Sequence, residues 1–117
     1  MKLTNTKKKY LLLIDAYEQN YDHVRAVDLA ARMGVARSSV HRMLCEMQEA
    51  GLVEKMPHRK IRLTEEGRQT VTSYREQYEG VYRFLTEKGG LNKYEAQEGA
   101  FALLDTLSPA SIEQLCK

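Results

Sequence analysis

The chain has 117 residues, of which 43% are hydrophobic and 29% charged, and these proportions are ordinary for a folded domain. No apolar run approaches the roughly 20 residues that a membrane span needs, and the length is short for a catalytic fold with an added cofactor domain. The formal net charge of +2 hides an asymmetry, because residues 1–63 carry 12 Lys and Arg against 7 Asp and Glu, whereas residues 64–117 carry 6 against 9. We therefore expect the first part to face a polyanion and the second part not to.

Cysteine use and short motifs predict a cytoplasmic protein that is not an enzyme. Cys45 and Cys116 fit a reducing compartment and lack a metal-ligand spacing such as CxxC. The basic first residues are followed by neither the apolar segment nor the cleavage site of a secretion signal. We find no GxSxG, HExxH or P-loop motif, and therefore expect no catalytic site.

Residues 7–20 are predicted to form the first helix. Tyr10, Ile14, Tyr17 and Tyr21 recur at helical spacing, and we interpret this stripe as core. One of the polar residues at positions 4–6 would cap the helix at its start. Val24 and Arg25 then have the composition of a short strand that could join a later sheet.

Residues 27–50 have the pattern of a helix-turn-helix, with helices at 27–33 and 37–50. Ala30 allows close helix approach, Gly34 suits the turn, and Val40 packs into the angle between the helices. The second helix then presents polar side chains from its first turns, the part of a recognition helix that meets base edges in the major groove. These predicted DNA contacts are Arg37, Ser38, Ser39, His41 and Arg42.

Residues 52–63 predict a two-stranded wing. Gly51 closes the recognition helix, the apolar pair 52–53 begins a strand, and alternation resumes at 61–63 after the interruption at 57–60. Cationic side chains along this hairpin would lie against phosphates beside the groove. They are Lys55, His58, Arg59, Lys60 and Arg62. The alternative is a positively charged hairpin on a module that binds protein.

Residues 64–117 predict three helices. The first runs from its Thr64 cap to about Lys88, and Gly89 and Gly90 end it. The second opens with a capping box at Asn92, and the third opens at Ser108 and Pro109. The stripe expected for the second helix comprises Tyr94, Gln97, Phe101 and Leu104, with Ala100 and Leu107 beside it.

The apolar stripes of these three helices exceed what so small a bundle can cover alone, so we expect a homodimer. Its predicted interface comprises Tyr74, Tyr78, Val81, Phe101 and Leu104. Two recognition helices would then read a palindromic operator in double-stranded DNA. The predicted fold class is mainly α with a small β wing: a winged helix-turn-helix DNA-binding domain at residues 1–63 followed by a helical dimerisation domain at residues 64–117.

Four stretches carry a family resemblance that runs from about Tyr10 to Leu115: VRAVDLAARMGVARSSVHRMLCEMQEAGLVEK, IRLTEEGR, YRFL and LSPASIEQL. Together they resemble the diphtheria-toxin-repressor and manganese-transport-regulator family of bacterial metalloregulators. The resemblance implies a winged-helix reader joined to a helical dimerisation domain, which represses transcription from operator DNA when Mn²⁺ or Fe²⁺ is present. The SH3-like domain of longer members is not expected.

The positions at which the resemblance places metal ligands hold few suitable donors. These positions are Lys9, Leu12, Tyr78, Tyr82, Gln97, Phe101, Leu104 and Asp105. Only Asp105 is a good ligand for a hard cation, and such cations need several carboxylate or imidazole donors. We therefore predict no metal cofactor and a metal-independent regulator, in which Lys9 could supply the missing positive charge against Asp105. The alternative is a Mn²⁺ or Fe²⁺ site rearranged among Glu79, Glu95, Glu98 and Asp105.

Overall fold

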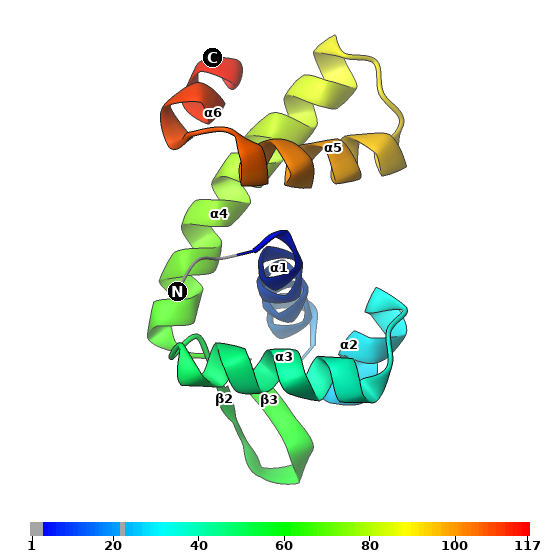
Figure 1. Ribbon diagram of the computed structural model, residues 1–117, viewed down its shortest axis with the longest axis vertical. Helices are drawn as coiled ribbons and strands as arrows, with labels where there is room; N and C mark the ends of the chain where they lie inside the picture. Colours follow the sequence, from blue (N-terminus) through cyan, green and yellow to red (C-terminus); the bar gives the residue numbers. More distant parts are fainter. Residues whose placement is uncertain (1–3, 22) are drawn as a thin grey trace. The chain divides into compact units, whose positions relative to one another are not determined.

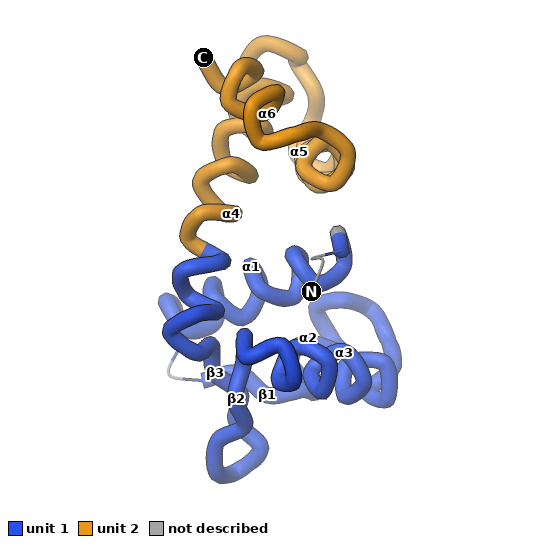
Figure 2. The backbone as a smooth tube through the Cα atoms, turned by 60° about the vertical axis from the view of Figure 1, so that its left-hand side comes forward, with its two compact units in different colours: residues 1–71 blue, residues 72–117 orange. Residues whose placement is uncertain are grey.

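The computed structural model describes residues 4–21 and 23–117 (Figure 1). Two compact units make up the chain, residues 1–71 and 72–117, and the division falls inside one long helix (Figure 2). The helices are α1 (Asn5–Asn20), α2 (Ala26–Met33), α3 (Arg37–Glu49), α4 (Glu65–Arg83), α5 (Lys93–Thr106) and α6 (Pro109–Leu115). The strands are β1 (Val24–Arg25), β2 (Val53–Lys55) and β3 (Lys60–Leu63). The predicted fold class, mainly α with a small β wing, is confirmed.

The strands form one antiparallel sheet in the order β1-β3-β2. In the hairpin, Val53 pairs with Leu63 and Lys55 pairs with Ile61. β1 adds a third strand, with Val24 opposite Ile61, so the predicted short strand at Val24 and Arg25 does join the sheet. The wing therefore rests on a strand that lies far away in the sequence and directly precedes α2.

The core of unit 1 is built from one face of each helix and from the inward side of the hairpin. Tyr10, Leu11 and Ile14 of α1 are buried, as expected from their helical spacing. Tyr21 does not continue the stripe, because α1 ends at Asn20 and its extended cap leaves Tyr21 65% exposed. The other buried members of this core are Val24, Leu29, Ala30, Val40, Leu44, Met47, Leu52, Val53, Ile61, Leu63 and Val71.

Glu18, near the end of α1, secures the base of the wing. Its Oε1 accepts a hydrogen bond from the backbone N–H of Leu63 at 2.8 Å, and its Oε2 lies 3.9 Å from Nε of Arg68. The Glu18 side chain is only 16% exposed. A buried N–H that loses its acceptor pays the full cost of desolvation.

We therefore expect Glu18→Ala to lower the free energy of unfolding by about 2 kcal/mol, measured by urea denaturation. Glu18→Gln is the matched control, since its amide oxygen can still accept the bond from Leu63. A loss of equal size in both variants would show that the charge of Glu18, and not its acceptor oxygen, carries the effect. An Ala variant as stable as the unaltered chain would contradict the anchoring role.

Unit 2 contains the rest of α4, a π-helical turn at Phe84–Lys88, α5 and α6. The predicted helix therefore does reach Lys88, but its last five residues change hydrogen-bond pattern, with the N–H of Gly89 donating to Phe84 O at 3.1 Å. A side chain at position 89 would meet Leu85 O at 2.7 Å, which explains the glycine. Asn92 and Ser108 cap α5 and α6 with their side chains, as predicted.

The face that α5 buries agrees with the predicted stripe at Ala100 and Leu104 and differs from it at Tyr94. Ala96, Ala100 and Leu104 are buried, whereas Tyr94 is 76% exposed, so the stripe that began at Tyr94 was wrong there. The two alanines allow α5 to lie close to its neighbours, a position that a tyrosine ring could not occupy. Helical periodicity extended the predicted stripe to the large side chain of Tyr94 and omitted the small Ala96.

Candidate nucleic-acid interface

The turn between α2 and α3 directs the first turns of α3 toward solvent. Gly34 takes a left-handed φ of +68° and ends α2, a conformation that costs a residue with a Cβ. On α3, Val40, Leu44 and Met47 face the core. The predicted DNA contacts of this helix all remain exposed, namely Arg37, Ser38, Ser39, His41 and Arg42. Their outward position is what base reading requires, and the contact itself stays a prediction.

The wing has a tight tip without glycine. A 3₁₀ turn at Pro57–Arg59 joins the strands, and the N–H of Met56 donates to Lys60 O at 2.8 Å to close the loop. His58 and Arg59 both have φ of +63°, in the left-handed region. That conformation costs a residue with a Cβ roughly 1–2 kcal/mol, and such strain is often found at functional sites.

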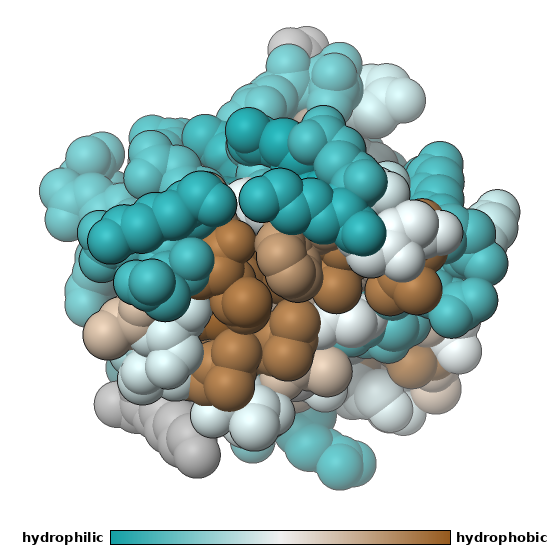
Figure 3. Space-filling model, turned by 90° about the horizontal axis from the view of Figure 1, so that it is seen from above, coloured by the Kyte–Doolittle hydropathy of each residue, from teal (hydrophilic) through white to brown (hydrophobic). Residues whose placement is uncertain are grey.

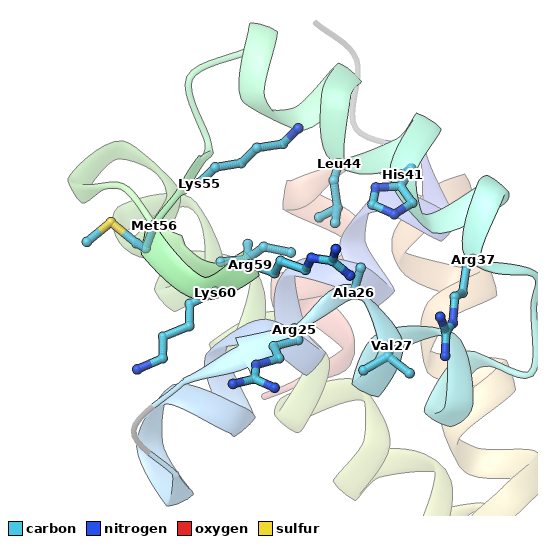
Figure 4. Close-up of a pocket in the computed structure, with 11 residues that line it drawn as sticks. Arg25, Ala26, Val27, Arg37, His41, Leu44, Lys55, Met56, Arg59 and Lys60 are labelled. Atoms are coloured by element: carbon cyan, nitrogen blue, oxygen red, sulfur yellow. The ribbon is translucent and has the colours of Figure 1, made fainter.

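A groove of about 630 Å³ lies between α3, the start of α2 and the wing (Figure 4). It brings together five of the ten predicted DNA contacts: Arg37, His41, Lys55, Arg59 and Lys60. Figure 4 shows the Arg59 side chain extending from the wing toward α3 and the start of α2, whereas Lys60 points away from them. The remaining lining residues are Arg25, Ala26, Val27, Leu44, Met56 and Ile61.

The groove is strongly cationic. Five Arg and Lys side chains and His41 line it, and no Asp or Glu is among the described residues on its walls. Like charges at this density repel one another unless an anionic partner offsets them. Apolar side chains also line the groove, among them Val27, which is 42% exposed. A phosphate backbone fits both properties, because its charges can meet the cations and its sugars can meet the apolar side chains.

Arg25 is a groove residue that sequence reasoning did not select. Its backbone N–H donates to Asp28 Oδ2 at 3.0 Å at the start of α2, so the carboxylate is used by the helix end. Its Cα lies opposite that of Lys60 in the β1–β3 pair, which brings its side chain beside the wing. Only the pairing of two strands that are distant in the sequence identifies Arg25 as a groove residue, and no local motif does so.

Five predicted contacts lie outside the groove lining. Ser38, Ser39 and Arg42 are exposed on α3, and His58 is exposed at the wing tip. Arg62 forms an ion pair with Glu54, its partner across the β2–β3 ladder. Both side chains are about half exposed, so this pair contributes little to stability and can open when a phosphate approaches.

Residues 2–61 match a family model described as "Iron dependent repressor, N-terminal DNA binding domain". The match covers the helix-turn-helix and nearly all of the wing. The chain belongs to the iron-dependent repressor family. This is a family of transcriptional regulators rather than enzymes.

Among curated proteins, the transcriptional regulator MntR of Escherichia coli O157:H7 is 36% identical over 80 residues, which are 68% of this chain and 52% of that protein. The chain thus spans about half the length of the curated relatives it matches. T. acidophilum IdeR superposes with a TM-score of 0.81 at 18% identity, over 93% of this chain and 51% of that one. The hypothetical protein SSo2273 from Sulfolobus solfataricus superposes with a TM-score of 0.71 at 22% identity, over 97% and 86%. These two likenesses concern the fold.

The family is described as iron dependent, which implies side chains that can coordinate a metal ion. Within residues 4–21 and 23–117, no three His, Cys, Asp or Glu side chains are grouped so that they could hold a metal ion. Aromatic rings occupy part of the aligned positions instead, with the Tyr78 ring centroid 6.1 Å from that of Tyr82 and 4.8 Å from that of Phe101. The donor set does not fit a hard or borderline divalent cation.

Asp105, the best donor among the aligned positions, lies near Tyr74. Burial raises the pKa of the Tyr74 phenol above its ordinary value, and the Asp105 carboxylate and the Tyr78 phenol raise it further. Lys9 lies on α1 in unit 1 and Asp105 on α5 in unit 2, and their pairing stays a prediction. In the part of the chain that the structure describes, no helix has the length and apolar character of a membrane span.

The residues predicted for a dimer interface differ in what they offer a second copy. Tyr74, Val81 and Leu104 are already buried within the chain, whereas Tyr78 and Phe101 are half-buried. Other apolar side chains of unit 2 are also only half-buried, namely Leu85, Leu91, Leu103, Leu107 and Leu115. Figure 3 shows an apolar area on the face seen from above in Figure 1, with hydrophilic residues along its upper side and residues of intermediate hydropathy below it.

Proposed function

We propose that this protein is a sequence-specific DNA-binding transcriptional regulator that acts as a homodimer and represses transcription without metal control. The groove between α3 and the wing carries the proposal, because it unites a recognition helix with cations from four further segments. Membership of the iron-dependent repressor family supports the same function. A module that only holds protein partners would not need so many cations in a groove beside a recognition helix.

The chemistry of the aligned ligand positions supports the absence of metal control. Tyr78, Tyr82 and Phe101 pack as a ring cluster, and this cluster can order α4 and α5 without an ion. The second candidate is a Mn²⁺- or Fe²⁺-responsive regulator with ligands among Glu79, Glu95, Glu98 and Asp105. The iron in the family description favours that candidate. Binding measured with and without metal separates the two.

A homodimer would cover the half-buried apolar side chains of unit 2. Tyr78 and Phe101 are the predicted interface residues with surface left to bury, and Leu103 and Leu107 of α5 are half-buried as well. A protein of this size rarely leaves a large contiguous apolar patch in water. Two copies joined in this way would present two recognition helices to the two halves of a palindrome.

The assignment of Arg42 to base reading can be tested with a duplex that the unaltered protein selects from a random pool. We expect Arg42→Ala to lower the preference for the selected duplex over a scrambled duplex about tenfold, because a lost bidentate base contact costs about 1–3 kcal/mol. Arg32→Ala is the control, since Arg32 is exposed on α2 outside the groove lining. This substitution removes the same charge as Arg42→Ala. Fluorescence anisotropy titrations measure both affinities. Equal loss on both duplexes for Arg42→Ala would contradict base readout.

A further inference from the structure

The first turn of α4 is bonded to the turn that ends the recognition helix α3. Thr64 Oγ1 donates to Gly51 O at 2.6 Å, and the N–H of Thr64 donates to Leu52 O at 3.0 Å. The same hydroxyl oxygen accepts from the N–H of Gly67 at 3.0 Å and so caps α4. One side chain therefore caps α4 and also joins it to the chain that leaves α3.

The two turns are also in direct backbone contact. A Cβ placed on Gly67 would lie 2.1 Å from Leu52 O, so only glycine fits at this position. Leu52 is in turn held to α3, because its N–H donates to Met47 O at 3.0 Å. Gly51 makes the bend with a left-handed φ of +78°. Hydrogen bonds and close packing thus connect the last turn of α3 to the first turn of α4.

α4 continues without interruption from Glu65 to Arg83 and passes from unit 1 into unit 2 between Val71 and Thr72. Thr64 and Gly67 both belong to the end of α4 that lies in unit 1. They join that end of the helix to the chain that leaves α3.

We propose that Thr64 and Gly67 are positioning residues for DNA reading, which fix the end of α3 to the first turn of α4. This inference rests on the proposed function as a homodimeric reader of palindromic DNA. In such a dimer, the position of each recognition helix follows the direction of its own α4. The junction then determines which half-site spacing the dimer accepts, although neither residue needs to touch DNA.

The two roles of Thr64 can be separated by substitution. Thr64→Ser keeps a hydroxyl that both donates to Gly51 O and accepts from the N–H of Gly67. Thr64→Asp keeps a good helix cap but has no hydrogen to donate to Gly51 O. A purely structural cap predicts that both variants behave alike. The positioning role predicts that only the Asp variant changes the half-site spacing that the protein prefers.

The experiment compares the unaltered chain, T64S and T64D at a temperature where thermal melts show all three folded. Anisotropy titrations use one half-site duplex and a series of palindromes whose half-site spacing changes by one base pair. We expect all three proteins to bind the half-site within about twofold. The unaltered chain and T64S should prefer one spacing, whereas T64D should lose about tenfold at that spacing and show a flatter profile.

A T64D profile like that of the unaltered chain would overturn the inference, and so would a parallel loss on half-site and palindromes. Failure of the unaltered chain to bind duplex DNA would instead overturn the proposed function. If T64D does not fold, the double variant T72G/S73G provides the test, because both residues are exposed on α4 beyond the junction. It should keep half-site affinity and flatten the spacing profile in the same way. An unchanged profile in that variant would also overturn the inference.

Discussion

Simultaneous replacement of Lys55, Arg59 and Lys60 by alanine is expected to lower the affinity for duplex DNA about 100-fold at about 0.1 M salt. All three cations lie on the wing side of the groove. Each phosphate they neutralise releases counterions, so the slope of log affinity against log salt should also fall by about 1 per residue. Selected and scrambled duplexes should lose affinity alike, because phosphate contacts carry no sequence information. Anisotropy titrations at several salt concentrations measure both quantities.

The matched control removes the same charge from the other unit. Arg83, Lys88 and Lys93 are exposed cations of unit 2, and their replacement by alanine changes the net charge by the same amount. We expect this second triple variant to bind DNA within about twofold of the unaltered chain. If both triple variants lost affinity equally, the effect would come from overall charge, and the groove would not be the DNA interface.

Gly67→Ala is expected to lower the free energy of unfolding by about 3 kcal/mol, since overpacking a tight contact commonly costs that much. The new Cβ would lie 2.1 Å from Leu52 O, and that oxygen cannot withdraw easily because it accepts a bond from Thr64. Helix propensity alone predicts the opposite sign, a gain of about 1 kcal/mol over glycine. Thermal and urea denaturation therefore distinguish packing from propensity by the sign of the change.

Gly99→Ala on α5 is the control for this substitution. Its Cβ would meet only the end of the Leu85 side chain at 3.0 Å, which can rotate away. We expect this variant to be at least as stable as the unaltered chain. A Gly67→Ala protein with unchanged or raised stability would show that the α3–α4 junction is looser than the contacts indicate.

Local chemistry in the sequence predicted most of the helix ends. Thr4, Asn92 and Ser108 cap helices with their own side chains, and a cap depends only on residues within one turn. The burial of Ala96 and the exposure of Tyr94 on α5 were not predictable in the same way, because Ala96 is buried for its small size. What it packs against comes from other helices, and helical periodicity does not contain that information.

In the candidate site, too, features that depend on neighbouring residues were predictable, and features that depend on distant segments were not. Exposure of Arg42 followed from the burial of Val40 on the opposite side of α3. Arg25 reaches the groove only through the pairing of β1 with β3, and Arg62 meets Glu54 only through the hairpin register. Both are cross-strand relations, which a linear pattern of residues does not specify. The left-handed backbone at the wing tip was equally hidden, because no glycine marks it.

The most direct test of the central claim is anisotropy of the purified protein on the DNA upstream of its own gene, first in EDTA and then with added Mn²⁺ or Fe²⁺. A metal-independent repressor should bind this DNA equally tightly in both conditions and prefer it over scrambled DNA. Binding that appears only after metal is added would contradict the account. It would show that the carboxylates of α4 and α5 form a ligand set that the aligned positions do not reveal.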